Sequence, residues 1–173
     1  MACRASMRPA PEMLLAGEVR VLAAFAHEGA ARRLVHNLKY GGPGSYADLV
    51  AELLAPRLPR APLVPIPRVW TRLLKHGIDP AGTIAGRLSR ILGVPVVACL
   101  ERPLHRSRRA GTDHSSTVGR FRVAAVPPEM ILVDDVVTTG ATIVAAARSV
   151  GSSRVRAAVA ANIVTEVSSL SAP

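Results

Sequence analysis

The stretch from Ile131 to Thr142 reads ILVDDVVTTGAT, and it decides the fold. An apolar run ends at Asp134 and Asp135, a short loop with threonines and Gly140 follows, and an alanine-rich segment then begins. This order predicts a strand over 130–134, a loop, and a helix over 141–150. Ligands of open α/β sheets bind at the carboxyl ends of strands, and a loop that enters a helix can bind phosphate. The stretch therefore predicts a site for a ligand that carries a phosphate and a diol.

The composition fits one domain with an aliphatic core. The chain has 173 residues, of which 49% are hydrophobic and only 3% aromatic, so the core has to be built from Ala, Val, Leu and Ile. Such a core is typical of a parallel sheet with helices on both faces. We expect a flexible N-terminal arm over residues 1–17, one domain over 18–167 and a polar tail over 168–173.

Apolar runs alternate with helical periodicities along the chain, which predicts a mainly parallel sheet with right-handed crossovers. Residues 19–28 fit either a strand or a short helix. Further strands are expected at 63–67, 94–100, 121–126, 130–134 and 155–164. Helices are expected at 30–40, 45–58, 80–93 and 141–150, with Asp79 as the N-cap of the third and Pro80 at its first position. Residues 102–119 have no apolar periodicity and are expected to form an exposed loop.

Charge and cysteine content bear on partners and compartment. The formal net charge of +10 is carried almost entirely by arginine and suits polyanions, whether nucleic acids, acidic membranes or phosphorylated metabolites. The two cysteines, Cys3 and Cys99, are too few for a four-thiolate zinc site. The sequence contains neither a secretory signal nor a stretch as long as a membrane span. We expect a reducing cytoplasm as the compartment.

The two adjacent carboxylates of Asp134 and Asp135 repel each other unless a cation or hydrogen-bond donors compensate them. A ribose diol with a Mg²⁺ ion nearby would do so, because Mg²⁺ typically binds one or two carboxylates together with substrate phosphates. Gly140 permits a positive φ and the close approach of a phosphate. The alternative interpretation is an ordinary helix cap that follows two solvated aspartates.

This segment resembles the phosphoribosyl-pyrophosphate (PRPP) binding motif of type I phosphoribosyltransferases. Three more stretches, Leu38–Gly42 (LKYGG), Val64–Pro67 (VPIP) and Arg72–Gly77 (RLLKHG), occur in the order seen in the ComF-like, competence-associated family of these enzymes. The similarity covers roughly Phe25 to Val164. It implies an α/β type I phosphoribosyltransferase fold, Mg²⁺ as cofactor, and displacement of pyrophosphate at the anomeric carbon of PRPP.

The resemblance also implies residue roles, although it assigns no catalytic residue. Asp134 and Asp135 would hold the ribose hydroxyls, with Mg²⁺ close by or bound indirectly. The 5′-phosphate would lie against a loop that consists of Val137, Thr138, Thr139, Gly140, Ala141 and Thr142. The pyrophosphate would face Arg72 and Lys75. Residues 102–120 would form a lid that carries Arg106, Arg108 and Arg109.

The chain departs from the family pattern on the pyrophosphate and acceptor sides. Relatives usually begin with a cysteine-rich zinc ribbon, and we expect no such module in these residues, since only Cys3 stands near the start. The family's Arg-Gly-Phe-Asn-Gln corresponds here to the stretch 76–80, which reads HGIDP and supplies fewer donors. Thr138 stands where purine-type relatives have an acid, which argues against a purine acceptor.

Three hypotheses therefore remain open. The first is a phosphoribosyltransferase with an unidentified acceptor, and the second is a non-catalytic PRPP- or nucleotide-binding protein or a DNA-uptake accessory protein of the competence type. The third is a basic nucleic-acid-binding domain in which Asp134 and Asp135 are structural. The stretch 102–122 contains six arginines and fits a phosphate lid, a nucleic-acid patch or a solvated loop, although scarce aromatics argue against base stacking. A homodimer also stays open.

Overall fold

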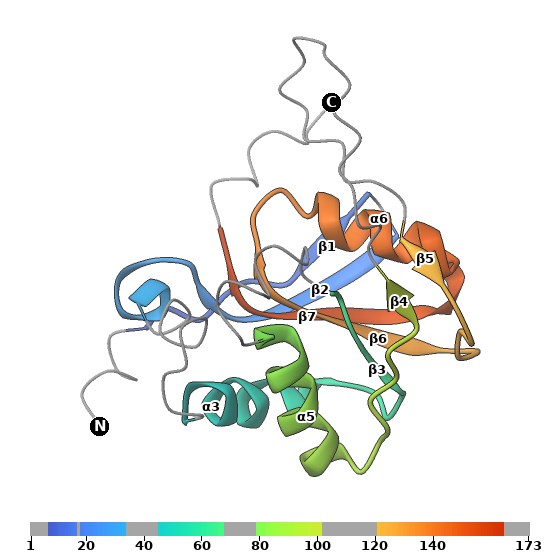
Figure 1. The fold of residues 1–173 in the computed structure, drawn as a ribbon. Helices are drawn as coiled ribbons and strands as arrows, with labels where there is room; N and C mark the ends of the chain where they lie inside the picture. Colours follow the sequence, from blue (N-terminus) through green and yellow to red (C-terminus); the bar gives the residue numbers. More distant parts are fainter. Residues whose placement is uncertain (1–6, 17, 34–44, 68–78, 102–120, 165–173) are drawn as a thin grey trace, which may run out of the picture.

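The computed structural model describes residues 7–16, 18–33, 45–67, 79–101 and 121–164. Within them, five strands form one mixed sheet in the order β1-β2-β7-β6-β3 (Figure 1). Their bounds are Met13–Leu15 (β1), Val19–Ala26 (β2), Leu63–Pro65 (β3), Met130–Val137 (β6) and Val155–Ile163 (β7). Strands β2, β7, β6 and β3 run parallel, and β1 pairs antiparallel with β2. The predicted α/β class with a mostly parallel sheet is confirmed.

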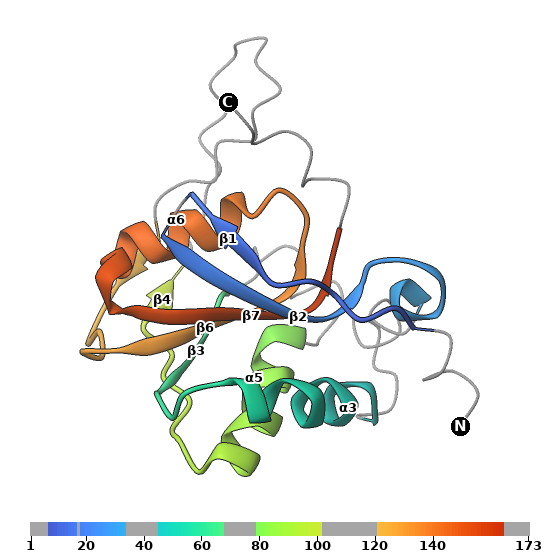
Figure 2. The same ribbon diagram turned by 180° about the vertical axis from the view of Figure 1, so that it is seen from behind.

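Helices cover both faces of this sheet. Helices α3 (Ser45–Leu54) and α5 (Pro80–Leu92) lie on one face, and α6 (Ala141–Val150) lies on the other, as Figures 1 and 2 show. Leu54 and Leu88 pack with Val133 of β6 on the first face, whereas Ile143 packs with Leu132 on the second. The buried residues are mostly Ala, Val, Leu and Ile, as the composition predicts. None of the described helices is long and apolar enough to cross a bilayer.

The chain leaves β3 and β6, which are adjacent parallel strands, in opposite directions. After β3 it passes through α5 and returns to the sheet at Val96, which forms a parallel bridge with Leu63. The N–H of Leu63 donates to Pro95 there, so this return lies on the outer side of β3, away from β6. After β6 the chain passes through α6 on the other face and returns at β7. The carboxyl ends of β3 and β6 therefore form a topological switch point, where ligands of open α/β sheets bind.

Two predicted strands are wrong in extent. Over 94–100 the structure has only the bridge at Val96 and then β4 (Leu100–Glu101). Pro95 before the bridge and Pro65 of β3 beyond it both lack the N–H that would continue the ladder. Over 121–126 only β5 (Arg122–Val123) forms, and it pairs with β4. In contrast, β6 is longer than predicted, since pairing with β7 continues to Val137.

Part of the segment expected as a flexible arm, residues 7–16, is among the described residues. Residues 13–15 form β1, which pairs with the open edge of β2 through a tight turn in which the N–H of Glu18 donates to Leu15. Met7 and Leu15 are buried, so apolar contact with the sheet holds this segment in place.

The predicted helices agree with the structure better than the predicted strands do. Helix α5 begins at Pro80 after the N-cap residue Asp79 and ends at Gly93, whose φ of +66° suits glycine. Helix α3 stops at Leu54, before a 3₁₀ turn that contains Pro56 (η1, Ala55–Arg57). Residues 29–33 are helical, and residues 19–26 form a strand rather than a helix. The rest of the predicted helix at 30–40, the loop at 102–119 and the polar tail lie outside the described residues.

Candidate functional site

The acid pair lies near the carboxyl end of β6, where that strand extends past its neighbour. Strand β3 ends with Pro65 opposite Val133, and Asp134 and Asp135 follow directly. The N–H of Asp135 donates to Oδ1 of Asp134 at 2.8 Å, and the N–H of Val136 donates to Oδ1 of Asp135 at 2.9 Å. Both aspartates are half-buried. Backbone hydrogen bonds therefore orient both carboxylates at the switch point.

Side-chain alternation along β6 is interrupted at the acid pair. Val133 and Val136 both pack on the α3 and α5 face of the sheet, whereas Val137 packs on the α6 face. Regular alternation would put residues three apart on opposite faces. The interruption changes the direction of the strand's side chains at Asp134 and Asp135, so the pair does not follow the simple in-and-out pattern expected of a strand.

The loop after β6 enters α6 without a side-chain cap. Thr138 and Thr139 are exposed, and Gly140 is the N-cap residue, with φ +74° and no side-chain cap hydrogen bond. The hydroxyl of Thr139 lies 3.4 Å from the N–H of Ala141, which is long for a hydrogen bond. The ordinary threonine cap is therefore a poor description of this loop. A helix start without a side-chain cap is the arrangement that suits anion binding.

Gly140 also lies directly against the N-terminal strand. A Cβ atom at this position would be 2.5 Å from Cδ1 and 2.7 Å from Cδ2 of Leu15. The twist of the sheet carries β1 to the α6 side, where the two segments meet (Figures 1 and 2). The sequence motif predicts glycine here for its positive φ, but it contains no signal for the contact with Leu15.

Hydrogen bonds join the carboxyl ends of the four parallel strands. The N–H of His27, after β2, donates to Ile163 at 2.7 Å, and the N–H of Val164, after β7, donates to Val137 at 2.9 Å. On the other side, the N–H of Ile66 donates to Val133 at 2.8 Å. Hydrogen bonds between neighbouring strands therefore continue past the ends of the regular strands at the edge of the sheet that carries the acid pair.

A buried polar network lies beside the acid pair. Asn162 is the one fully buried polar side chain in the part of the chain that the structure describes, and it stands opposite Val136 in the register of β6 and β7. The Tyr46 hydroxyl donates to Oδ1 of Asn162, and burial raises the pKa of Tyr46 well above its usual range. The Asn162 amide nitrogen lies 3.1 Å from Nδ1 of His27.

The orientation of the Asn162 amide indicates the tautomer of His27. Because Oδ1 of Asn162 accepts from Tyr46, the amide nitrogen of Asn162 faces His27 as a donor. Nδ1 of His27 is then an acceptor, and a neutral imidazole carries its proton on Nε2. Sequence reasoning missed this network. Its one signal is an asparagine inside the otherwise apolar end of β7.

The carboxylate of Asp79, at the start of α5, has a hydrogen-bond acceptor that the described residues leave unsatisfied. Its Oδ1 is buried and has no hydrogen-bond partner among the described residues, and the side chain does not cap the helix. The N–H and hydroxyl of Thr83 donate instead to the backbone carbonyl of Asp79, each at 2.9 Å. A buried acceptor of this kind is where solvent or a ligand is expected to donate.

The structure places only part of the predicted site. The acid pair and the loop 137–142 are contiguous at the switch point. The predicted cations all lie outside the described residues; they are Arg72, Lys75 and the lid residues Arg106, Arg108 and Arg109. No group of three or more His, Cys, Asp or Glu side chains able to hold a metal occurs among the described residues. The acid pair fits a Mg²⁺ ion only if substrate phosphates and water complete its coordination.

Comparison of the chain with protein-family models gives no match, and a search of curated proteins also gives none. The site itself, with the order of its elements and the chemistry of its side chains, is therefore what bears on function.

Proposed function

We propose that this chain is a PRPP-dependent phosphoribosyltransferase with the type I fold, acting on an unidentified acceptor. The observation that supports the proposal most is the position of the acid pair and the uncapped loop at the switch point between β3 and β6. The sequence motif alone specifies a strand, a loop and a helix start, but not their position in the fold. A position at the carboxyl edge of a parallel sheet is where a phosphorylated ligand is expected.

In this proposal, Asp134 and Asp135 accept hydrogen bonds from the ribose hydroxyls of PRPP. Their carboxylates are already oriented by backbone N–H groups, so little side-chain entropy is lost on binding. The 5′-phosphate receives hydrogen bonds from the first turn of α6 and from the exposed hydroxyls of Thr138 and Thr139. The positive end of the α6 dipole adds to the attraction.

The leaving group would be stabilised by cations on the other side of the switch point. Arg72 and Lys75 follow β3, whose end is hydrogen-bonded to β6 through Ile66 and Val133. Pyrophosphate departs from the anomeric carbon through an oxocarbenium-like state, and charge on its oxygens is what Arg72 and Lys75 would offset. A bound Mg²⁺ would add further neutralisation there. The arginines at 106, 108 and 109 would exclude water when the lid closes.

A non-catalytic PRPP- or nucleotide-binding protein, including a DNA-uptake accessory protein, is the second candidate. The substitution of the family's donor-rich stretch by the residues of 76–80 favours it, because the pyrophosphate side then has fewer donors. In that case the ribose-phosphate half of the site would bind ligand, and no bond would break.

Calorimetric titration with PRPP, with and without Mg²⁺, tests binding. The wild type is expected to bind in a Mg²⁺-dependent manner, and the double variant Asp134→Asn/Asp135→Asn is expected to lose at least about tenfold in affinity. Asp48→Asn is the matched control, because Asp48 lies on α3 and pairs with Arg87 at 3.1 Å. Absence of PRPP binding by the wild type would refute both candidates.

Pyrophosphate release then separates the two candidates. The proposed enzyme releases pyrophosphate from PRPP when one member of a panel of nucleobases is added, whereas a binding protein does not. A basic nucleic-acid-binding domain would instead bind DNA with a steep salt dependence, and Asp134→Asn/Asp135→Asn would leave that binding unchanged.

A further inference from the structure

A second charged region lies at the opposite edge of the sheet. Arg20 is near the start of β2 and Arg156 is near the start of β7, so both stand at the amino-terminal edge of the parallel strands, opposite to the edge that carries the candidate site. A cavity of about 580 Å³ opens between these strand starts, η1 and the 3₁₀ turn η2 (Ser152–Arg154). It is a broad depression that is open to solvent, so a charged ligand could enter it directly.

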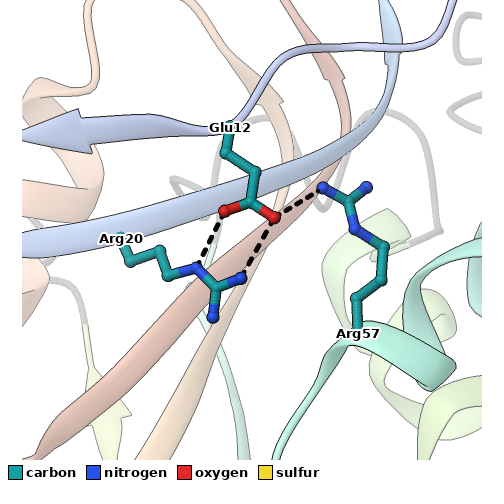
Figure 3. Close-up of polar contacts among 3 residues, drawn as sticks. All are labelled: Glu12, Arg20 and Arg57. Carbon is teal, nitrogen blue, oxygen red and sulfur yellow. Dashed lines mark hydrogen bonds and ion pairs between the residues drawn. The ribbon is translucent and has the colours of Figure 1, made fainter.

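Two arginines in this region already hold a carboxylate. Nε and Nη2 of Arg20 donate to the two oxygens of Glu12, each at 3.0 Å, and Nη2 of Arg57 donates to Oε1 of Glu12 at 2.9 Å (Figure 3). These hydrogen bonds, first from Arg20 and then from Arg57, lower the pKa of Glu12 to about 2. The two guanidinium groups therefore converge on one oxyanion, and they come from β2 and η1.

A third arginine completes the basic lining of the cavity. Arg156 is largely exposed, and its Nε lies 3.8 Å from Oε2 of Glu129, which is long for an ion pair with direct hydrogen bonding. The rest of the wall is largely apolar and proline-rich, with Pro56, Leu58, Pro59 and Val155. Planar guanidinium groups over such a wall suit phosphate oxygens, because each can donate two parallel hydrogen bonds.

We propose that this cavity binds a phosphate group, which competes with the Glu12 carboxylate for hydrogen bonds from Arg20 and Arg57. A phosphate brings more charge and more acceptor oxygens than the carboxylate, and Arg156 is close enough to the same cavity to add donors. The phosphate can belong to a small phosphorylated molecule or to a nucleic-acid backbone. This site does not depend on the proposed transferase function, because it lies at the other edge of the sheet.

Two-dimensional amide NMR separates the two sites in one titration with inorganic pyrophosphate. The backbone amides of Ser153 and Arg156 report on the cavity, and those of Thr138 to Thr142 report on the candidate PRPP site. The cavity amides are expected to shift with pyrophosphate and to return as sodium chloride is added, because exposed charges are screened. Cavity amides that stay unmoved by both pyrophosphate and a single-stranded oligonucleotide would overturn the proposal, whatever the amides of Thr138 to Thr142 do.

Three variants define what binds. Arg57→Gln/Arg156→Gln is expected to weaken cavity binding at least about tenfold. Glu12→Gln is expected to strengthen it about two- to fivefold, because the competing carboxylate is gone. Arg90→Gln, an exposed arginine in the last turn of α5, is the matched control and should bind like the wild type. Equal binding by the double arginine variant and the wild type would contradict the assignment, and since both arginines are exposed their removal should leave the fold intact.

The source of the phosphate follows from the same spectra. If pyrophosphate shifts the cavity amides at lower concentration of phosphate groups than the oligonucleotide does, a small phosphorylated molecule is the ligand. If only the oligonucleotide shifts them, the ligand is a nucleic-acid backbone.

Discussion

Gly140 is constrained in two ways at the start of α6. Its φ of +74° disfavours any residue with a Cβ, and such an atom would lie 2.5 Å from Leu15. We expect Gly140→Ala to lower the free energy of unfolding by about 2–4 kcal/mol, from left-handed backbone strain and from displacement of Leu15. Urea denaturation measures this change.

A second glycine separates the two causes. Gly93 has a φ of +66°, but no atom lies within 4 Å of where its Cβ would be. Gly93→Ala should therefore cost only the strain, about 1 kcal/mol. In a Leu15→Ala background, the cost of Gly140→Ala should fall toward that of Gly93→Ala. If the effects of the substitutions at positions 15 and 140 on the free energy of unfolding are additive, the contact with Leu15 does not cause the larger cost of Gly140→Ala.

Single residues also show where the sequence falls short. The motif at 131–142 predicts which residues of the loop are adjacent, because they are adjacent in the chain. It cannot predict that Tyr46, Asn162 and His27 meet in one hydrogen-bonded network, since the three come from α3, β7 and the end of β2. Contacts of this kind depend on how elements pack, and only the lone asparagine in an apolar run hints at them.

At the scale of elements, the ion pairs of Glu12 fasten β1 to the rest of the molecule and should make stability depend on pH. Its pKa is lowered from 4.5 to about 2 in the folded state, so its contribution is fully present above about pH 4.5 and is lost as the pH falls toward 2. We expect the difference in Tm between wild type and Glu12→Gln to be constant from pH 8 to 5, to shrink as the pH falls toward 2, and to vanish only below pH 2.

Thermal unfolding followed by circular dichroism across this pH range measures the effect. Glu52→Gln, at an exposed glutamate on α3, is the control variant. A difference between wild type and Glu12→Gln that stays the same at pH 5 and pH 2 would show that the ion pairs with Arg20 and Arg57 are not its origin.

Elements differ in how well periodicity predicts them. The helices α5 and α6 begin and end where apolar spacing, Pro80 and the glycines at 93 and 151 indicate, because these signals are local. Strand lengths were wrong at both sheet edges. Residues 94–100 look like a strand in composition, but the prolines at 65 and 95 leave a single bridge, whereas β1 forms because β2 offers it a partner. Because the pairing partners of a strand lie elsewhere in the chain, the length of a strand cannot be predicted from its own residues alone.

At the scale of the whole molecule, the sequence predicts the fold class and the segment that carries the candidate site. The aliphatic composition and the alternation of strands and helices are enough to predict a mostly parallel sheet with helices on both faces. The switch point between β3 and β6 is not predictable in the same way. It depends on the face of the sheet on which each helix packs and on the side on which the chain then rejoins the sheet. The predicted cations at Arg72 and Lys75, together with the lid arginines, remain predictions.

The short strand β1 has a consequence for shortened forms of the chain. All residues of β2 except Arg20 are buried, and β1 covers the edge of that strand. A chain that begins at residue 18 would remove the partners of Val19–Val21 and of Phe25 at this edge, and their free backbone groups would then be able to pair with another copy. We expect this form to aggregate at concentrations where a chain that begins at residue 7 stays monodisperse in light scattering. If both forms scatter alike, β1 is not what keeps neighbouring molecules apart.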